Sequence, residues 1–257
     1  MADSSSHLRS DLDAGREQVA QACRVLAHRG LVEGVLGHVS LRFGEGMLLR
    51  CRGPQESGLR FTKAQDIRLI GLDGTALESL DGWKPPSEWP IHGELMRLRT
   101  DVNCVVHAHP PSALVVGLAE LPLRPVFGAF NVPALRMAVE GVPVYRRSVL
   151  ITSPELVQAL HEAMEDKDVC ILQGHGVAVI GDDIAQAISR TIDLDALTSV
   201  TRDLAQINAN PPEVPPEDLA DLSVPESKAL ETMVWRSLLA DAEADAQRPQ
   251  PSRHPPN

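Results

Sequence analysis

Two histidines, His107 and His109, are separated by a single residue in the apolar segment that precedes Pro110. Alternate residues of a β-strand point to the same face, so a strand here would present two imidazoles side by side. Buried polar groups need partners, and a shared divalent metal would satisfy both rings, because neutral imidazole is a good ligand for Zn, Fe, Mn or Co. The alternative is a pair of structural histidines bonded to backbone carbonyls. The pattern alone leaves both interpretations open.

A third histidine, His175, lies between Gly174 and Gly176, directly after an apolar run. Glycine on both sides allows the backbone to bend sharply and to approach a bound group closely. Taken by itself, His175 is typical of an ordinary turn. If His107 and His109 bind a metal, His175 is the predicted third ligand.

Glu88 and His92 are four residues apart in a predicted helix and therefore share one face of it. Ser87 is the expected N-terminal cap, which places Glu88 in the first turn, where the helix dipole favours an ionised carboxylate. Such a group could bind the metal, act as a general base, or do both. A solvated glutamate is the simpler interpretation of Glu88 alone. We expect His92 to pack, or to support a neighbour of the metal.

Three more residues are candidates for contact with a substrate. His38 lies on the turn from the first predicted helix into a strand, whereas Arg50 and Arg52 end the next strand on one face of it. Paired guanidinium groups at a strand end suit a carboxylate or a phosphate. Two solvated arginines at an exposed edge fit the pattern equally well.

Short strands are expected to position these groups, and helices to cover them. Hydrophobic alternation bounded by turn residues predicts strands, whereas a period near 3.6 with capping residues predicts helices. Because the hairpins imply antiparallel pairing, we expect an α/β sheet flanked by helices in layers. The predicted strands are residues 38–43, 47–52, 67–72, 103–109 and 142–146, with two more within 169–181. The predicted helices end at Gly30, span 87–99, begin near Ser112 and at Ser153, and span 183–207 and 226–243.

The composition changes after the last candidate residues. Residues 1–208 are predicted to form one catalytic domain with a well-buried core. Residues 209–244 hold an acidic, proline-rich segment, expected to be extended, and then the C-terminal helix. Residues 245–257 are predicted to be a disordered tail.

Charge and cysteine usage exclude several classes of protein. Lys and Arg total 24 against 35 Asp and Glu, a formal net charge of −11, which disfavours binding to nucleic acid or to an anionic membrane. No apolar stretch has the length of a signal peptide core or of a membrane span. The four cysteines are widely spaced within apolar runs, as in reduced core residues. We therefore predict a cytoplasmic protein that acts on a small molecule.

Taken in order, four segments resemble the class II aldolase/adducin family. They are GHVSLR (37–42), PSEWPIHGELMR (86–97), VVHAHP (105–110) and QGHGVAVIG (173–181). The resemblance implies a central, mainly antiparallel sheet with helices on both faces, assembled as a homotetramer. It also implies that His107, His109 and His175 bind the metal, and that Glu88 contacts the metal and moves protons.

The sequence departs from the sugar-phosphate aldolases of this family where those enzymes hold phosphate. They carry an asparagine where His38 stands, a Thr-Pro-Ser-Gly type of loop near 52–58, and two serines before the glutamate. Here the loop is RCRGPQESG, and Pro86-Ser87 precedes Glu88. Guanidinium and imidazole groups in place of hydroxyl donors favour a carboxylated substrate. The residues expected to bind it are His38, Arg50, Arg52 and Ser87.

The order GHVSLR, RCRGP and FT is similar to the branch that decarboxylates dihydroxylated aromatic acids, such as dihydroxyphthalate or dihydroxycumate. We predict a metal-dependent lyase that decarboxylates a hydroxylated aromatic acid. It should bind one divalent ion, with Zn as the preferred metal and Fe, Mn or Co as alternatives. A related branch resembles non-heme iron oxygenases that oxidatively decarboxylate a prenylated hydroxyphenylpyruvate in aminocoumarin pathways. A metal-dependent aldolase and a non-catalytic scaffold of the adducin type are two further interpretations of the same residues.

Overall fold

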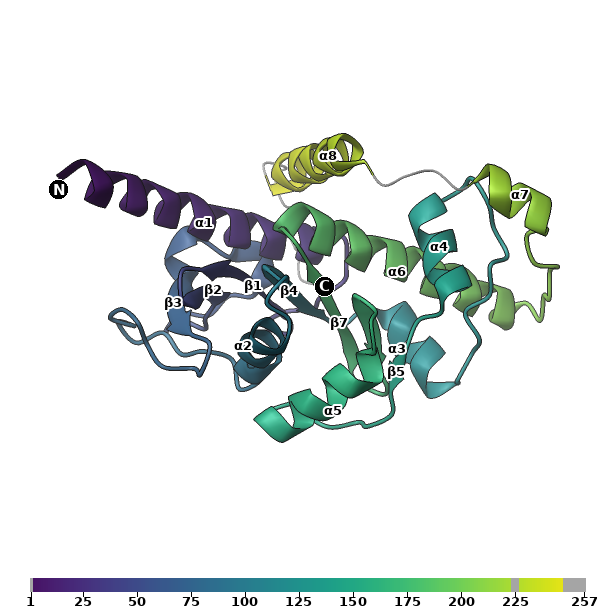
Figure 1. The fold of residues 1–257 in the computed structure, drawn as a ribbon, viewed down its shortest axis with the longest axis horizontal. Helices are drawn as coiled ribbons and strands as arrows, with labels where there is room; N and C mark the ends of the chain where they lie inside the picture. The colour runs from purple at the N-terminus through teal and green to yellow at the C-terminus, as the bar shows by residue number, and fades with distance from the viewer. Residues whose placement is uncertain (1, 223–226, 247–257) are drawn as a thin grey trace, which may run out of the picture.

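A seven-stranded sheet lies at the centre of the computed structural model, which describes residues 2–222 and 227–246 (Figure 1). The strand order is β3-β2-β1-β4-β7-β6-β5, and every neighbouring pair is antiparallel except β5 and β6. The predicted mainly antiparallel α/β sheet is confirmed. The strands are β1 (His38–Phe43), β2 (Gly46–Arg50), β3 (Ile67–Gly71), β4 (Cys104–Ala108), β5 (Val144–Tyr145), β6 (Val169–Leu172) and β7 (Gly176–Gly181).

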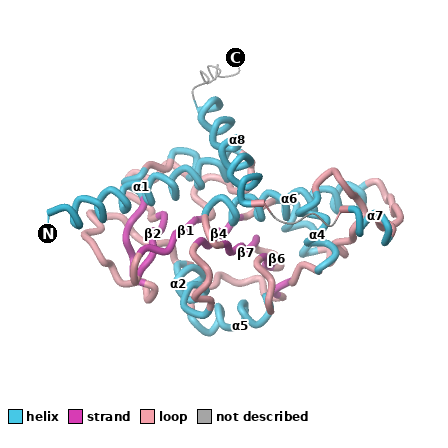
Figure 2. Tube along the Cα trace, turned by 45° about the horizontal axis from the view of Figure 1, so that its top comes forward, coloured by secondary structure: helices cyan, strands magenta, loops and turns pink. Residues whose placement is uncertain are grey.

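Helices cover both faces of the sheet, as Figures 1 and 2 show. One apolar layer joins the sheet to α1, α3, α6 and α8, and the other joins it to α2 and α5. None of the described helices is long and apolar enough to cross a membrane. The α-helices are α1 (Ala2–His28), α2 (Trp89–Leu98), α3 (Pro111–Leu118), α4 (Val132–Glu140), α5 (Pro154–Met164), α6 (Ile184–Gln206), α7 (Pro216–Asp221) and α8 (Lys228–Ala246). Two single turns of 3₁₀-helix, η1 (Leu59–Phe61) and η2 (Ala64–Asp66), link β2 to β3.

The predicted starts of α5 and α6 and the predicted end of α1 are confirmed. The Ser153 side chain accepts from the Leu156 N–H at 3.4 Å and begins α5, and Asp183 begins α6 in the same way. Gly30, with φ of 69°, carries the chain out of α1. The start of α1 at Ala2 has no comparable signal, because its first turns contain no apolar stripe.

Two expectations about the C-terminal part were wrong. The proline-rich segment is not extended throughout, since α7 begins with Pro216 at its first position and Glu217 and Asp218 in its first turn. The predicted disordered tail at 245–257 starts too early, because α8 continues to Ala246. Asp245 accepts a hydrogen bond of 2.5 Å from Arg60, which fixes the last turn. Residues 247–257 lie outside the described part of the chain.

The register of the sheet gathers the candidate residues at one end of it. His38 pairs with His107 between β1 and β4, and His107 pairs with Ala178 between β4 and β7. Cross-strand partners point to the same face, so His38 and His107 both face α2. Gly37 makes this approach possible, since a Cβ atom there would lie 3.0 Å from the His107 carbonyl oxygen and its φ is 83°.

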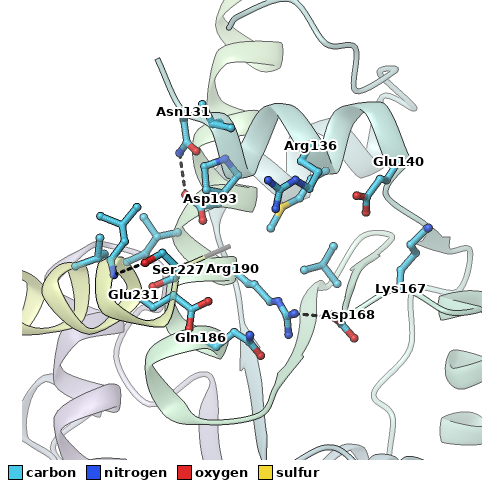
Figure 3. A pocket seen from close by; sticks show the side chains of 18 of the residues that line it. Asn131, Arg136, Glu140, Lys167, Asp168, Gln186, Arg190, Asp193, Ser227 and Glu231 are labelled. Atoms are coloured by element: carbon cyan, nitrogen blue, oxygen red, sulfur yellow. Dashed lines mark hydrogen bonds and ion pairs between the residues drawn. The ribbon is translucent and has the colours of Figure 1, made fainter. Parts of the chain in front are cut away.

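A separate hollow of about 690 Å³ lies between α4, α6 and the start of α8, away from the candidate residues (Figure 3). Some of its polar groups pair with one another. Arg190 Nη2 lies 2.8 Å from Asp168 Oδ2, and Asn131 Nδ2 donates to Asp193 Oδ1 at 2.8 Å.

Asp193 makes the fold sensitive to pH from this hollow. Burial raises the pKa of Asp193 from 3.8 to about 6, although the Asn131 N–H opposes the change. The pKa of Asp193 is higher in the folded than in the unfolded protein. Its protonated carboxyl therefore contributes fully to the free energy of unfolding below about pH 4, and this contribution is lost as the pH rises through about 6. Asp193→Asn should therefore raise the free energy of unfolding by about 1–3 kcal/mol at pH 7.5.

Urea unfolding at pH 7.5 and pH 4.5 measures this effect. The gain should fall to less than half at the lower pH, because the wild-type carboxyl is then mostly protonated in the fold. An equal gain at both pH values would contradict the assignment.

Candidate metal centre

His107 lies near the end of β4, and its ring is fully buried. Its Nδ1 donates a hydrogen bond of 2.9 Å to the carbonyl oxygen of Val177. A carbonyl can only accept, so the neutral ring carries its proton on Nδ1 and presents a lone pair at Nε2. That Nε2 lies 2.9 Å from His109 Nε2 and 3.7 Å from Glu88 Oε2. A cation between these atoms would satisfy all three.

His175 completes the cluster from the turn between β6 and β7. Its backbone N–H donates to the Leu172 carbonyl at 3.0 Å, which closes the turn. Both ring nitrogens are buried and lack a hydrogen-bond partner, and Nε2 lies 3.6 Å from Glu88 Oε1. His107, His109 and His175 each offer one nitrogen within 4.8 Å of the others. Buried imidazole nitrogens left without partners at this spacing fit a metal ion.

Glu88 is buried and turns its carboxylate toward these histidines. Oε1 accepts a hydrogen bond of 2.8 Å from the backbone N–H of Ile151. The expected cap was misplaced by one residue, since the Trp89 N–H bonds to the Pro86 carbonyl and Glu88 itself takes the capping position, without a capping hydrogen bond. Ser87 is exposed in that turn.

The electrostatics of the cluster suit a divalent cation. Burial, with a contribution from neighbouring imidazoles, lowers the pKa of His107 to about 3 and that of His109 to about 4. Burial would raise the pKa of Glu88, but His175, His107 and the Ile151 N–H outweigh it and lower the pKa to about 2. At neutral pH the site therefore offers neutral imidazoles and one carboxylate, the protonation states that metal binding requires.

His38 stands beside this cluster and is held by His92. A ligand atom of His38 lies within 4.8 Å of one from Glu88 and one from His107. His92 Nε2 is 2.6 Å from His38 Nδ1, so His92 supports a neighbour of the cluster. Ser40, whose Oγ is 2.7 Å from His92 Nδ1, was not among the predicted site residues. The sequence could have indicated Ser40, because a residue two positions after His38 in a strand lies on the same face of the sheet.

The two arginines lie in different surroundings. Arg50 pairs with Ile67 of the α1-side layer, acts on the pKa of Cys23 in α1, and donates to Glu56 at 2.5 Å. It therefore extends from the face opposite His38. Arg52 lies beyond the strand end, where it donates to the Val35 carbonyl at 3.4 Å. Burial lowers the pKa of His38 well below its usual range, and the Arg52 charge adds to that effect. The structure brings Arg52 toward the histidines but does not bring Arg50.

The fold and the histidine cluster together fit a metal-dependent enzyme. Residues 17–201 match the family described as Class II Aldolase and Adducin N-terminal domain, so the chain belongs to the class II aldolase and adducin family. The chain is 45% identical over 229 residues to 3,4-dihydroxyphthalate decarboxylase of Arthrobacter keyseri, covering 88% of this chain and 92% of that protein. It is 38% identical to 3,4-dihydroxyphthalate decarboxylase of Rhodococcus jostii, covering 91% and 98% of the two chains.

Solved structures share the fold at lower sequence identity. An aldolase II superfamily protein from Pseudomonas syringae superposes with a TM-score of 0.77 at 19% identity, covering 91% of this chain and 93% of that one. An L-fuculose 1-phosphate aldolase from Glaciozyma antarctica superposes with a TM-score of 0.75 at 17% identity, covering 94% of each chain. These similarities confirm the predicted architecture.

Removal of one histidine should abolish metal binding. Wild-type protein dialysed against Zn²⁺ and then against buffer should retain about one ion per chain, whereas His107→Ala should retain almost none, because it removes the ring at the centre of the cluster. Elemental analysis measures the ion, and circular dichroism checks the fold. His161→Ala, on α5 outside the cluster, is the matched control. Full occupancy in the His107 variant would show that the ion is held elsewhere.

Proposed function

We propose that this enzyme releases CO2 from an aromatic acid that carries adjacent hydroxyl groups, of the dihydroxyphthalate type. The observation that carries the proposal is the largely buried cluster of three histidines and Glu88 in a chain 38% to 45% identical to 3,4-dihydroxyphthalate decarboxylases over most of its length. Aldolases of the family are more distant, as in the 30% identity to a 5-methylthioribulose-1-phosphate/5-deoxyribulose-1-phosphate aldolase from Rhodospirillum rubrum.

His107, His109 and His175 are the proposed metal ligands, with Glu88 as a fourth. When bound, the ion would act as a Lewis acid toward adjacent oxygen atoms of the substrate. Nitrogen and carboxylate donors favour Zn, while Fe, Mn and Co accept the same set. Homotetrameric assembly and a cytoplasmic location are further predictions from the family resemblance.

Glu88 is the proposed proton carrier. Its low pKa keeps it ionised in the free site, so it can take a proton from a substrate hydroxyl. It would return that proton to the ring carbon that bears the carboxylate. The carbon–carbon bond then breaks, CO2 leaves, and the electron pair of that bond restores the aromatic ring as a phenolate, which regains a proton from water. The Ile151 N–H fixes one carboxylate oxygen during this transfer.

Arg52 is the proposed partner of the substrate carboxylate. It lies close enough to His38 for its charge to act on that ring, whereas the Arg50 guanidinium is bonded to Glu56. His38 would contact the same part of the substrate. Ser87, exposed next to Glu88, stays a candidate for binding the far side of the ring.

Anaerobic turnover tests the proposed reaction against the oxygenase and the aldolase. With Zn²⁺, Mn²⁺ or Co²⁺ bound and O2 excluded, the enzyme should release CO2 from 3,4-dihydroxyphthalate, because the reaction needs no oxidant. Release of ¹⁴CO2 from carboxyl-labelled substrate and chromatography of the product measure it. A strict need for O2 and Fe(II) would favour the oxygenase, and cleavage of sugar phosphates alone would favour the aldolase.

Arg52→Ala should lower kcat/KM for a carboxylated substrate by roughly 10- to 100-fold, since a hydrogen bond between charged groups is lost. The loss should be expressed chiefly in KM, with metal content unchanged. Arg146→Ala is the matched control, because Arg146 forms an exposed pair with Glu120. An unchanged KM in the Arg52 variant would remove this residue from the substrate site.

A further inference from the structure

His38 is supported by a buried chain of two polar side chains that the proposed reaction does not use. His92 Nε2 lies 2.6 Å from His38 Nδ1, and Ser40 Oγ lies 2.7 Å from His92 Nδ1. Ser40 and His92 are fully buried, and His38 is 3% exposed. The three side chains come from one strand face and from α2, which covers that face.

The direction of these hydrogen bonds follows from Ser40. Its bond to His92 is the one hydrogen bond that the Ser40 side chain makes in the described part of the chain. A buried hydroxyl proton without an acceptor costs about 1–3 kcal/mol, so the Ser40 O–H donates to His92 Nδ1. A neutral His92 then carries its proton on Nε2 and donates it to His38 Nδ1. The remaining proton of His38 must lie on Nε2.

Both rings are neutral in this environment. Burial lowers the pKa of His92 to about 3, against weaker opposing effects of Glu88 and the Val105 carbonyl. The contact of 2.6 Å between His92 Nε2 and His38 Nδ1 has room for one proton, so with His92 as the donor His38 carries no proton on Nδ1 and is neutral. The hydrogen-bond chain therefore ends in an uncharged N–H group.

This N–H lies at the edge of the metal centre. With Nδ1 bonded to His92, Nε2 is the His38 nitrogen left for another partner, and one ring nitrogen of His38 lies within 4.8 Å of ligand atoms of Glu88 and His107. The position matters because His38, Glu88 and His107 form a second group with the spacing of a metal site. A protonated nitrogen cannot bind a cation, so the tautomer of His38 decides which group holds the ion.

We propose that Ser40 and His92 are positioning residues that lock His38 as an Nε2–H donor, which bonds an oxygen of the substrate's carboxylate and leaves the ion to the other three histidines. This inference rests on the proposed function for the identity of the substrate. The opposite order, with His92 donating from Nδ1 to Ser40 or to the Val105 carbonyl, would give His38 a free lone pair at Nε2. His38 would then be a competing ligand.

The tautomer can be measured without turnover. In ¹⁵N spectra of histidine-labelled, Zn-loaded protein, His38 should show a protonated Nε2 and an unprotonated Nδ1, with its signals assigned by their loss in His38→Asn. Ser40→Ala should mix or reverse this pattern, and Ser40→Thr, which keeps the hydroxyl, should restore it. Ser79→Ala, which removes an exposed hydroxyl bonded to Asp81, is the control for labelling and fold.

Kinetics provide the second readout. Ser40→Ala should raise KM for 3,4-dihydroxyphthalate roughly tenfold with metal content unchanged, because one oriented hydrogen bond is weakened. An unprotonated Nε2 in the wild-type protein, or a Ser40→Ala variant with the wild-type tautomer, would overturn the inference. If the tautomer is as expected but no aromatic acid is turned over, the proposed function fails while the hydrogen-bond chain stands.

Discussion

The convergence of three imidazoles and Glu88 is the constraint on which the rest of the structure depends. His107 Nε2 and His109 Nε2 approach to 2.9 Å, while Val177 fixes the proton of His107 on the other nitrogen. His175 adds two buried ring nitrogens without partners. Buried lone pairs that converge in this way cost free energy unless a cation lies between them. The strands, the turn at His175 and the start of α2 are all arranged to bring about this convergence.

β4 has the central part in that arrangement. It lies between β1 and β7, so its register places His38 on one side of His107 and the turn before β7 on the other. In an antiparallel pair the end of one strand lies beside the start of its neighbour. The end of β4 therefore lies next to residues from distant parts of the sequence. α2 supplies two further side chains, four residues apart. Glu88 at its start faces the cluster, and His92 supports His38.

The features that depend on local periodicity could be predicted from the sequence. Two histidines on one strand face, the caps of α5 and α6 and the antiparallel sheet all follow from short-range patterns. Arg50 shows where such patterns fail, since the period of two relates it to Arg52 but does not say which layer its strand face meets. The backbone N–H of Ile151 had no sequence signal at all, because any residue type except proline supplies one.

Charge placement explains how an acidic chain can attract an anionic substrate. The net charge of −11 repels a carboxylated aromatic acid at long range, so attraction must arise locally. Glu56 already pairs with Arg50, and burial favours the uncharged forms of His38 and His92, so Arg52 and a bound ion would supply positive charge near the cluster. A divalent ion outweighs the single carboxylate of Glu88. The attraction would therefore be confined to the proposed substrate site, and the neutral donor proposed at His38 would orient the substrate without adding charge that competes with the metal.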